Sequence, residues 1–292
     1  MSVRIECVAD LGCILGEGPV WDGRQGRLWW VDIKGPAVCR YDPQTGRIES
    51  WPAPEPVGAL ALRQAGGLLL SLKSGFAFLD PDTGEVTRLL DPEPGLPGNR
   101  LNDGACDPSG RFWAGSMDDA EQSPTGHLYR LDPDLSLKRF DASFVVTNGP
   151  AFAPDGSVLY FADSPQRTIW AYAFDLARGE PGPRRLFAQL GEADGHPDGM
   201  CVDADGCLWS AHWDGGRLSR YTPDGSVERT VLMPVPRVTK PCFGGAGLDE
   251  LYVTSARIGL DDVELARAPL SGGLFRITGL GVKGAPSPRF AG

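Results

Sequence analysis

Among the pairs in which an acidic or amide residue directly precedes a glycine, four lie far apart in the chain and before an apolar segment. They are Glu17-Gly18, Asp103-Gly104, Asn148-Gly149 and Asp198-Gly199. Carboxylate and amide oxygens suit hard divalent cations, Ca²⁺ above all, with Mg²⁺ or Mn²⁺ as alternatives. A cation held by few protein ligands keeps positions open for water and substrate, as catalysis by a metal requires. The simpler interpretation is that the Asn-Gly and Asp-Gly pairs only form turns.

An internal repeat indicates how such residues could meet. A short apolar segment, a polar turn and a second apolar segment with a large residue near its middle recur six times. These large residues are Trp29, Leu69, Trp113, Tyr160, Trp209 and Tyr252, at intervals of 40, 44, 47, 49 and 43 residues. Such intervals are typical of four-stranded propeller blades. The sequence therefore predicts an all-β fold, a six-bladed β-propeller of four-stranded antiparallel blades, with residues 1–292 as a single domain.

A propeller ring must also close. Residues 3–8 form a spare strand with no blade of its own. We expect this N-terminal strand to pair as the outer strand of the last blade, which removes a free sheet edge. The long connection over residues 256–272 is expected to hold a short helix around residues 261–268.

The propeller fold turns the glycine pattern into a geometric prediction. The first strand of each blade lines the central channel, and its first residue lies at the rim of one face. Aligning the blades on their glycines gives a ring of six residues: Glu17, Val57, Asp103, Asn148, Asp198 and Phe243. Four of them carry oxygen ligands, which would repel one another without a cation. Second strands end on the same face, so Lys73 and Asp119 are expected near this mouth, where a solvated loop residue is the simpler role.

Composition narrows the classes of partner. The chain has 28 Lys and Arg against 38 Asp and Glu, a net charge of −10, which disfavours nucleic acid and membrane surfaces. No signal peptide or membrane span is expected from the sequence. The seven cysteines form no CxxC pair and are read as reduced thiols of a cytoplasmic protein. The oligomeric state stays open between a monomer and a weak homo-oligomer.

Other catalytic patterns are weak. There is no Gly-x-Ser-x-Gly nucleophile elbow and no His-Glu-x-x-His zinc motif. Residues 279–284 match Gly-x-Gly-x-x-Gly, but they follow the last blade, where no βαβ unit can form. We interpret that match as a coincidence in a flexible tail.

Six short motifs at blade spacing resemble the SMP-30/gluconolactonase/regucalcin family, and most closely its bacterial sugar (aldono)lactonases. The motifs are Gly16–Trp21, Arg100–Gly104, Gly110–Met117, Thr147–Pro150, Pro197–Met200 and Cys242–Gly245. The resemblance runs from about Glu17 to the last blade. It implies a lactonase that hydrolyses a sugar-acid lactone, such as a pentono- or gluconolactone, to the free aldonic acid.

The resemblance also implies roles for particular residues. One divalent cation would be bound by Glu17, Asn148 and Asp198, and the family's metals include Ca²⁺, Zn²⁺, Mn²⁺ and Fe²⁺. Arg100 and Asn102 would hold substrate hydroxyls. An acidic residue in the following loop would contact the substrate, with Asp119 favoured over Glu121.

A lactone builds negative charge on its carbonyl oxygen during hydrolysis, and a cation at that oxygen stabilises the transition state. Asp198 is the candidate catalytic residue, either as the base that deprotonates water or as a ligand of the cation that activates it. Two other functions remain open at this point. The propeller could be a metal-binding scaffold without catalysis, or a related metal-dependent phosphoester hydrolase.

Overall fold

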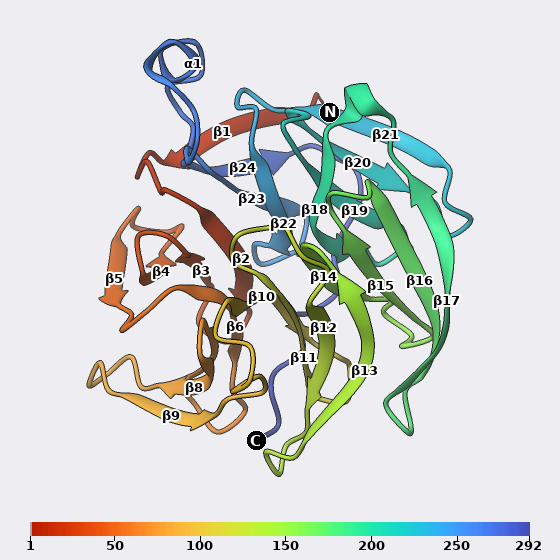
Figure 1. The fold of residues 1–292 in the computed structure, drawn as a ribbon. Helices are drawn as coiled ribbons and strands as arrows, with labels where there is room; N and C mark the ends of the chain where they lie inside the picture. Colours follow the sequence, from red (N-terminus) through yellow and green to blue (C-terminus); the bar gives the residue numbers. More distant parts are fainter. Residues whose placement is uncertain (1) are drawn as a thin grey trace.

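The computed structural model describes residues 2–292, and its strands form six separate four-stranded sheets. All pairings inside the sheets are antiparallel, and the sheets surround a common centre like blades (Figure 1). The first strands of the blades, β2, β6, β10, β14, β18 and β22, lie innermost. The all-β prediction and the six-bladed propeller are therefore confirmed.

The first three blades are built from consecutive strands. Blade 1 contains β2 (Gly16–Asp22), β3 (Arg27–Asp32), β4 (Ala37–Tyr41) and β5 (Ile48–Pro52). Blade 2 contains β6 (Val57–Leu62), β7 (Leu68–Leu72), β8 (Gly75–Leu79) and β9 (Val86–Leu90). Blade 3 contains β10 (Asn99–Cys106), β11 (Phe112–Asp118), β12 (Gly126–Leu131) and β13 (Leu137–Phe144).

Blades 4 and 5 follow the same plan. Blade 4 contains β14 (Thr147–Phe152), β15 (Val158–Asp163), β16 (Thr168–Asp175) and β17 (Glu180–Gln189). A 3₁₀ turn, η1 (Glu192–Asp194), leads to blade 5. Blade 5 contains β18 (His196–Val202), β19 (Leu208–Trp213), β20 (Arg217–Tyr221) and β21 (Val227–Leu232).

Blade 6 closes the ring with strands from both ends of the chain. It contains β22 (Val238–Gly244), β23 (Glu250–Ser255), β24 (Leu274–Thr278) and, outermost, the N-terminal strand β1 (Arg4–Ala9). The antiparallel pairing of β1 with β24 confirms the expected closure. The helix α1 (Asp262–Arg267) lies in the connection between β23 and β24, where a short helix was expected, and projects from the ring in Figure 1.

The apolar core fills the interfaces between neighbouring blades. Each of six apolar clusters joins two adjacent blades; one, for example, packs Trp209 of blade 5 against Val238 and Phe243 of blade 6. Buried tryptophans need a partner for the indole N–H. In blade 5 the indole of Trp209 donates to the Asp203 carboxylate at 2.9 Å, and blade 3 repeats this bond between Trp113 and Asp107 at 3.0 Å. This packing fixes the height at which each inner strand presents its side chains to the channel.

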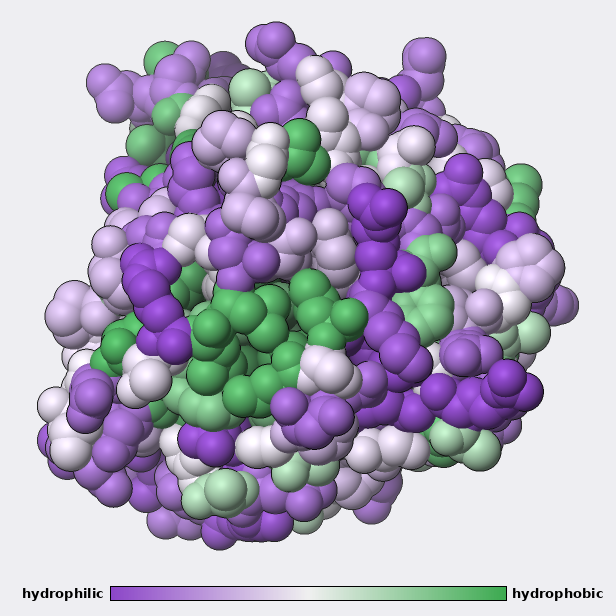
Figure 2. Space-filling view, turned by 60° about the horizontal axis from the view of Figure 1, so that its bottom comes forward, coloured by the Kyte–Doolittle hydropathy of each residue, from purple (hydrophilic) through white to green (hydrophobic). Residues whose placement is uncertain are grey.

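On the side shown in Figure 2, hydrophilic residues dominate and surround one compact apolar patch. Within residues 2–292, no helix combines the length and the apolar character needed to cross a membrane.

Candidate metal and substrate site

Strand register defines the ring of residues at the mouth of the channel. In each blade the large residue of the second strand pairs with an inner-strand residue: Val20, Ala61, Ala105, Ala151, Cys201 and Cys242. Counting three residues back from each of these gives the ring as the structure has it: Glu17, Gly58, Asn102, Asn148, Asp198 and Thr239. Three of the six ring positions predicted from the glycine alignment, Val57, Asp103 and Phe243, are therefore wrong.

The errors come from the way the inner strands are built. Every inner strand has a register irregularity just past the mouth. The glycine used for the alignment directly follows the ring residue in blades 1, 4 and 5, but it is the ring residue itself in blade 2 and lies further along the strand in blades 3 and 6. Asn102 replaces Asp103 in the ring, and Gly58 replaces Val57. Phe243 lies deeper, and its ring packs edge-on against Trp209 at a centroid distance of 6.1 Å.

The predicted metal ligands come together at this mouth. Glu17, Asn148 and Asp198 are all buried, and all three line one cavity of about 230 Å³. The carboxyl groups of Glu17 and Asp198 lie close enough for the charge of Glu17 to act on Asp198. Each also accepts the N–H of the glycine that follows it, at 2.7 Å for Glu17 and 2.9 Å for Asp198. Three inner strands thus place two carboxyl groups and one amide in the wall of one cavity.

Hydrogen bonds orient the amide of Asn148. Its Nδ2 donates to the Ser164 hydroxyl at 2.8 Å, and that hydroxyl donates to the carbonyl of Pro197 at 2.6 Å. The amide oxygen is left to accept a long bond of 3.4 Å from Asn102 Nδ2. Ser164 therefore selects the orientation in which Asn148 offers an oxygen, the atom that a hard cation binds.

The carboxyl groups at this point are short of positive charge. Burial, reinforced by the charge of Asp103, raises the pKa of Glu17 to about 8. Burial also raises the pKa of Asp198 well above its usual range, and the charges of Glu17 and Asp103 act in the same direction. Two carboxyl groups and an oriented amide oxygen fit a divalent cation, which would compensate this charge.

A scan limited to acidic, histidine and cysteine side chains does not detect this arrangement. Among residues 2–292, no group of three or more His, Cys, Asp and Glu side chains could hold a metal ion. The set described above contains only two such side chains, because its third member is an amide. The assignment of Glu17, Asn148 and Asp198 as metal ligands thus stays a prediction.

Asp103, which the glycine alignment placed in the ring, has another partner one layer deeper. Its carboxylate forms a buried ion pair with the Lys240 ammonium and accepts the N–H of Gly149 at 3.1 Å. The other residues of this layer are Gly18, Ala59, Gly149 and Gly199. A Cβ on Gly199 would lie 2.5 Å from Lys240 carbons, so the absence of a side chain there makes room for the lysine.

Lys240 was not predicted as a site residue, although the sequence around it contains a signal. It is the only charged residue of β22, whose seven residues are all buried. A lone lysine in a strand of that kind needs an acidic partner. With Lys240 included, the four buried groups Glu17, Asp103, Asp198 and Lys240 carry a net charge of −2 when ionised, which one divalent cation would balance.

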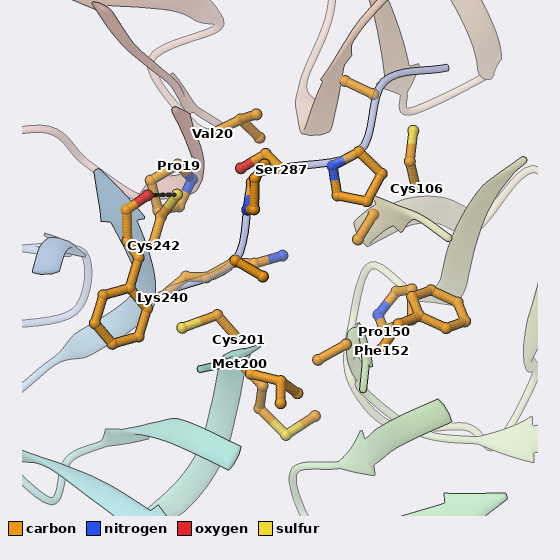
Figure 3. A pocket seen from close by; sticks show the side chains of 18 of the residues that line it. Pro19, Val20, Cys106, Pro150, Phe152, Met200, Cys201, Lys240, Cys242 and Ser287 are labelled. Carbon is orange, nitrogen blue, oxygen red and sulfur yellow. Dashed lines mark hydrogen bonds between the residues drawn. The ribbon is translucent and has the colours of Figure 1, made fainter. Parts of the chain in front are cut away.

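The other end of the channel is apolar. A cavity of about 410 Å³ lies there, walled by the deeper parts of the six inner strands and by residues 285–288 of the C-terminal tail. Lys240 is one of its few polar residues, and its side chain reaches toward the middle of the channel (Figure 3). Burial raises the pKa of the Cys201 and Cys242 thiols in this wall, which disfavours their reactive thiolates. The groups suited to chemistry therefore gather at the opposite mouth.

The predicted substrate-binding residues stand beside the metal ligands. Arg100 and Asn102 line the same cavity, and Arg100 Nη1 donates to Asn102 Oδ1 at 2.5 Å. Glu121 also lines it, from a backbone position with φ of 58°. Asp119, the favoured acidic residue, does not line the cavity; it accepts hydrogen bonds from Lys34, Lys73 and Arg100. The geometry thus favours Glu121 for direct contact, and both roles stay predictions.

The remaining wall of the cavity is largely apolar or aromatic. Its other residues are Leu15, Ile33, Val146, Ser164, Pro165, His196, Trp213 and Asp214. His196 Nδ1 lies 3.0 Å from the carbonyl oxygen of Ser164, which holds the imidazole at the rim. Such a wall limits the water around the polar groups at its base.

The fold and the site define a six-bladed β-propeller with oxygen ligands at one mouth of its channel. A family model described as SMP-30/Gluconolactonase/LRE-like region matches residues 15–257. The chain belongs to this family, as the sequence motifs indicated.

Individual relatives cover the whole chain. Regucalcin of Xenopus laevis is 40% identical over 297 residues, covering 100% of this chain and 99% of the relative. A 6-deoxy-6-sulfogluconolactonase of Pseudomonas putida is 38% identical, and all of both chains is covered. The crystal structure of a calcium-binding protein, regucalcin of Agrobacterium tumefaciens, has a TM-score of 0.93 and 31% identity, with 97% of this chain and 96% of that chain covered.

The raised carboxyl pKa values predict a pH-dependent stability of the metal-free protein. The folded state holds a proton on Glu17 up to a pH of about 8, whereas the unfolded chain releases it near the ordinary value of 4.5. The stability linked to this proton is therefore present below pH 4.5 and is lost as the pH rises through 8. We expect the free energy of unfolding in urea, measured with a chelator present, to fall over this window.

The matched control is the double variant Glu17→Gln, Asp198→Asn, which removes both titrating groups and keeps their shape. Its free energy of unfolding should fall less steeply between pH 4.5 and 8 than that of the wild type. Parallel pH profiles for the two proteins would show that these carboxyl groups are not crowded.

Proposed function

We propose that this protein uses one divalent cation, bound by Glu17, Asn148 and Asp198, to hydrolyse the lactone of a sugar acid to the free aldonic acid. The observation that carries the proposal is the meeting of three residues from separate blades in one cavity, beside the hydrogen-bonding groups of Arg100 and Asn102. Their oxygens suit Ca²⁺ best, with Mg²⁺, Mn²⁺, Zn²⁺ or Fe²⁺ as alternatives.

The protein is a lactonase. The description of its family includes gluconolactonase. A relative that is 38% identical and is covered over its whole length is a 6-deoxy-6-sulfogluconolactonase. The calcium-binding description of the structurally similar regucalcin supports a divalent cation here as well. A cytoplasmic location and a monomeric or weakly oligomeric state stay predictions.

The chemistry needs a group that stabilises charge and a group that handles a proton. A bound cation would supply Lewis-acid stabilisation of the oxyanion that forms on the lactone carbonyl. Asp198 would hold the attacking water and accept its proton as the ionised carboxylate, because it lines the cavity beside the other candidate ligands. Arg100 and Asn102 would bind the sugar hydroxyls, since both line the same cavity beside the candidate metal ligands.

The rest of the cavity would keep the ester in position. Leu15, Ile33 and Trp213 give it an apolar wall around the polar base. An apolar wall strengthens the electrostatic interactions inside, because fewer waters screen them. With a volume of about 230 Å³ the cavity fits a small ligand rather than a polymer.

Removal of the metal tests the proposal against a catalytically silent scaffold. We expect dialysis against EDTA to abolish hydrolysis of gluconolactone and pentonolactones above the spontaneous rate, and added Ca²⁺, Mn²⁺, Zn²⁺, Fe²⁺ or Mg²⁺ to restore it. A pH-stat or indicator assay measures the acid released. Full activity in a sample shown by elemental analysis to be metal-free contradicts the proposal, and metal binding without hydrolysis supports a scaffold.

Replacement of the candidate base is the sharper test. Asp198→Asn should lower kcat by roughly 100-fold or more at saturating metal, the usual contribution of a general base. Titration calorimetry must confirm that the variant is loaded with metal, and Asp224→Asn, in an exposed turn, is the control. Near wild-type turnover of metal-loaded Asp198→Asn would refute this role.

A further inference from the structure

Three cationic side chains from three blades converge on one carboxylate near the mouth of the channel. Asp119 accepts hydrogen bonds from Lys34 Nζ at 2.9 Å, Lys73 Nζ at 3.0 Å and Arg100 Nε at 2.9 Å. We call Lys34, Lys73, Arg100 and Asp119 the cationic cluster. Although partial burial acts to raise the pKa of Asp119, the bonds from Lys34 and Lys73 and the charge of Arg100 lower it to about 2. Asp119 is therefore ionised at neutral pH.

Positive charge is in excess in this cluster. Within the cluster, three cations face one carboxylate. The whole chain, by contrast, has a net charge of −10. A local positive excess on an acidic protein attracts and orients anions.

The cluster also has hydrogen-bond donors to spare. An ammonium group has three donors and a guanidinium group has five. Lys34 and Lys73 each make one side-chain hydrogen bond within residues 2–292, both to Asp119. In the same part of the chain, Arg100 uses Nε and Nη1, and its Nη2 has no partner. A ligand with several acceptor oxygens could therefore bind without displacing Asp119.

The cluster is connected to the candidate metal ligands through a short chain of contacts. Arg100 lines the cavity and bonds to Asn102, which lies 3.4 Å from the Asn148 oxygen. On its other side Arg100 bonds to Asp119 and so to the two lysines. The lysine side chains are 32% and 36% exposed, so both are accessible from solvent. The positive excess is thus linked to the cavity through Arg100.

A purely structural role for the cationic cluster does not explain why three cations surround one carboxylate. One cation is enough to compensate Asp119, and the other two repel each other and the first across a partly buried site. Lysine side chains are readily solvated, so Lys34 and Lys73 could stay in water at little cost. Asp119 instead holds both ammonium groups beside Arg100, which preorganises them for a further anion.

We propose that the cationic cluster is a subsite for an anionic group on the substrate, a sulfonate, phosphate or carboxylate carried by the lactone at the end remote from its ester. This inference rests on the proposed lactone hydrolysis and names its substrate class. Asp119 is then a positioning residue that holds two lysines in place, and Arg100 touches both the sugar and the anionic group.

The affinity for product acids tests the subsite without requiring turnover. Gluconate and gluconate 6-phosphate differ by one anionic substituent, and titration calorimetry on the metal-loaded protein at low ionic strength gives their Kd values. We expect gluconate 6-phosphate to bind at least tenfold more tightly, with a preference that shrinks as salt is added. In the double variant Lys34→Met, Lys73→Met the ratio of the two Kd values should approach one. Lys138→Met, on the exposed outer strand β13, is the control and should keep the wild-type ratio.

Equal affinities in the wild type, or a preference that survives in the double variant, overturn the subsite. If the double variant does not fold, Lys34→Gln and Lys73→Gln singly must each reduce the ratio. Competitive inhibition of gluconolactone hydrolysis by the same two acids separates this inference from the proposed function. Hydrolysis without discrimination between the acids refutes the subsite alone, and absence of metal-dependent hydrolysis of any lactone, neutral or anionic, refutes the function.

Discussion

The crowding of acidic groups in the channel is the constraint on which the rest of the site depends. Glu17, Asp103 and Asp198 are all buried within reach of one another's charge. Lys240 neutralises one carboxylate from below, and the remaining two share the mouth with the Asn148 amide. Such an arrangement is unfavourable without a compensating charge, and a divalent cation at the mouth would turn it into a binding site.

The propeller supplies the rigidity that this arrangement needs. Apolar clusters between blades hold the inner strands, and buried Asp–Trp bonds repeat in blades 3 and 5. Ring closure by β1 joins both ends of the chain in blade 6. Small residues in the layer below the mouth, Gly199 above all, leave the space that the Lys240 side chain fills. The fold thus explains why residues from distant blades can be held at one point.

Much of this could be predicted from the sequence, because the 40–49-residue interval between large apolar residues depends only on local strand patterns. Glu17, Asn148 and Asp198 were placed together correctly, since in their blades the glycine follows the ring residue. In the other three blades the glycine does not directly follow the ring residue, so the alignment wrongly placed Val57, Asp103 and Phe243 in the ring. Lys240 and the contacts of Asp119 depend on pairings between blades, which no pattern within one strand reveals.

The most direct test of the account is anomalous diffraction from crystals grown with Mn²⁺, because it locates a bound metal without reference to activity. The account predicts one strong anomalous peak at the channel mouth, within about 2.0–2.5 Å of oxygens from Glu17, Asn148 and Asp198. It also predicts that Lys240 stays paired with Asp103 below that peak. A protein with full lactonase activity and no peak at this point, or a peak bound by other residues, would contradict it.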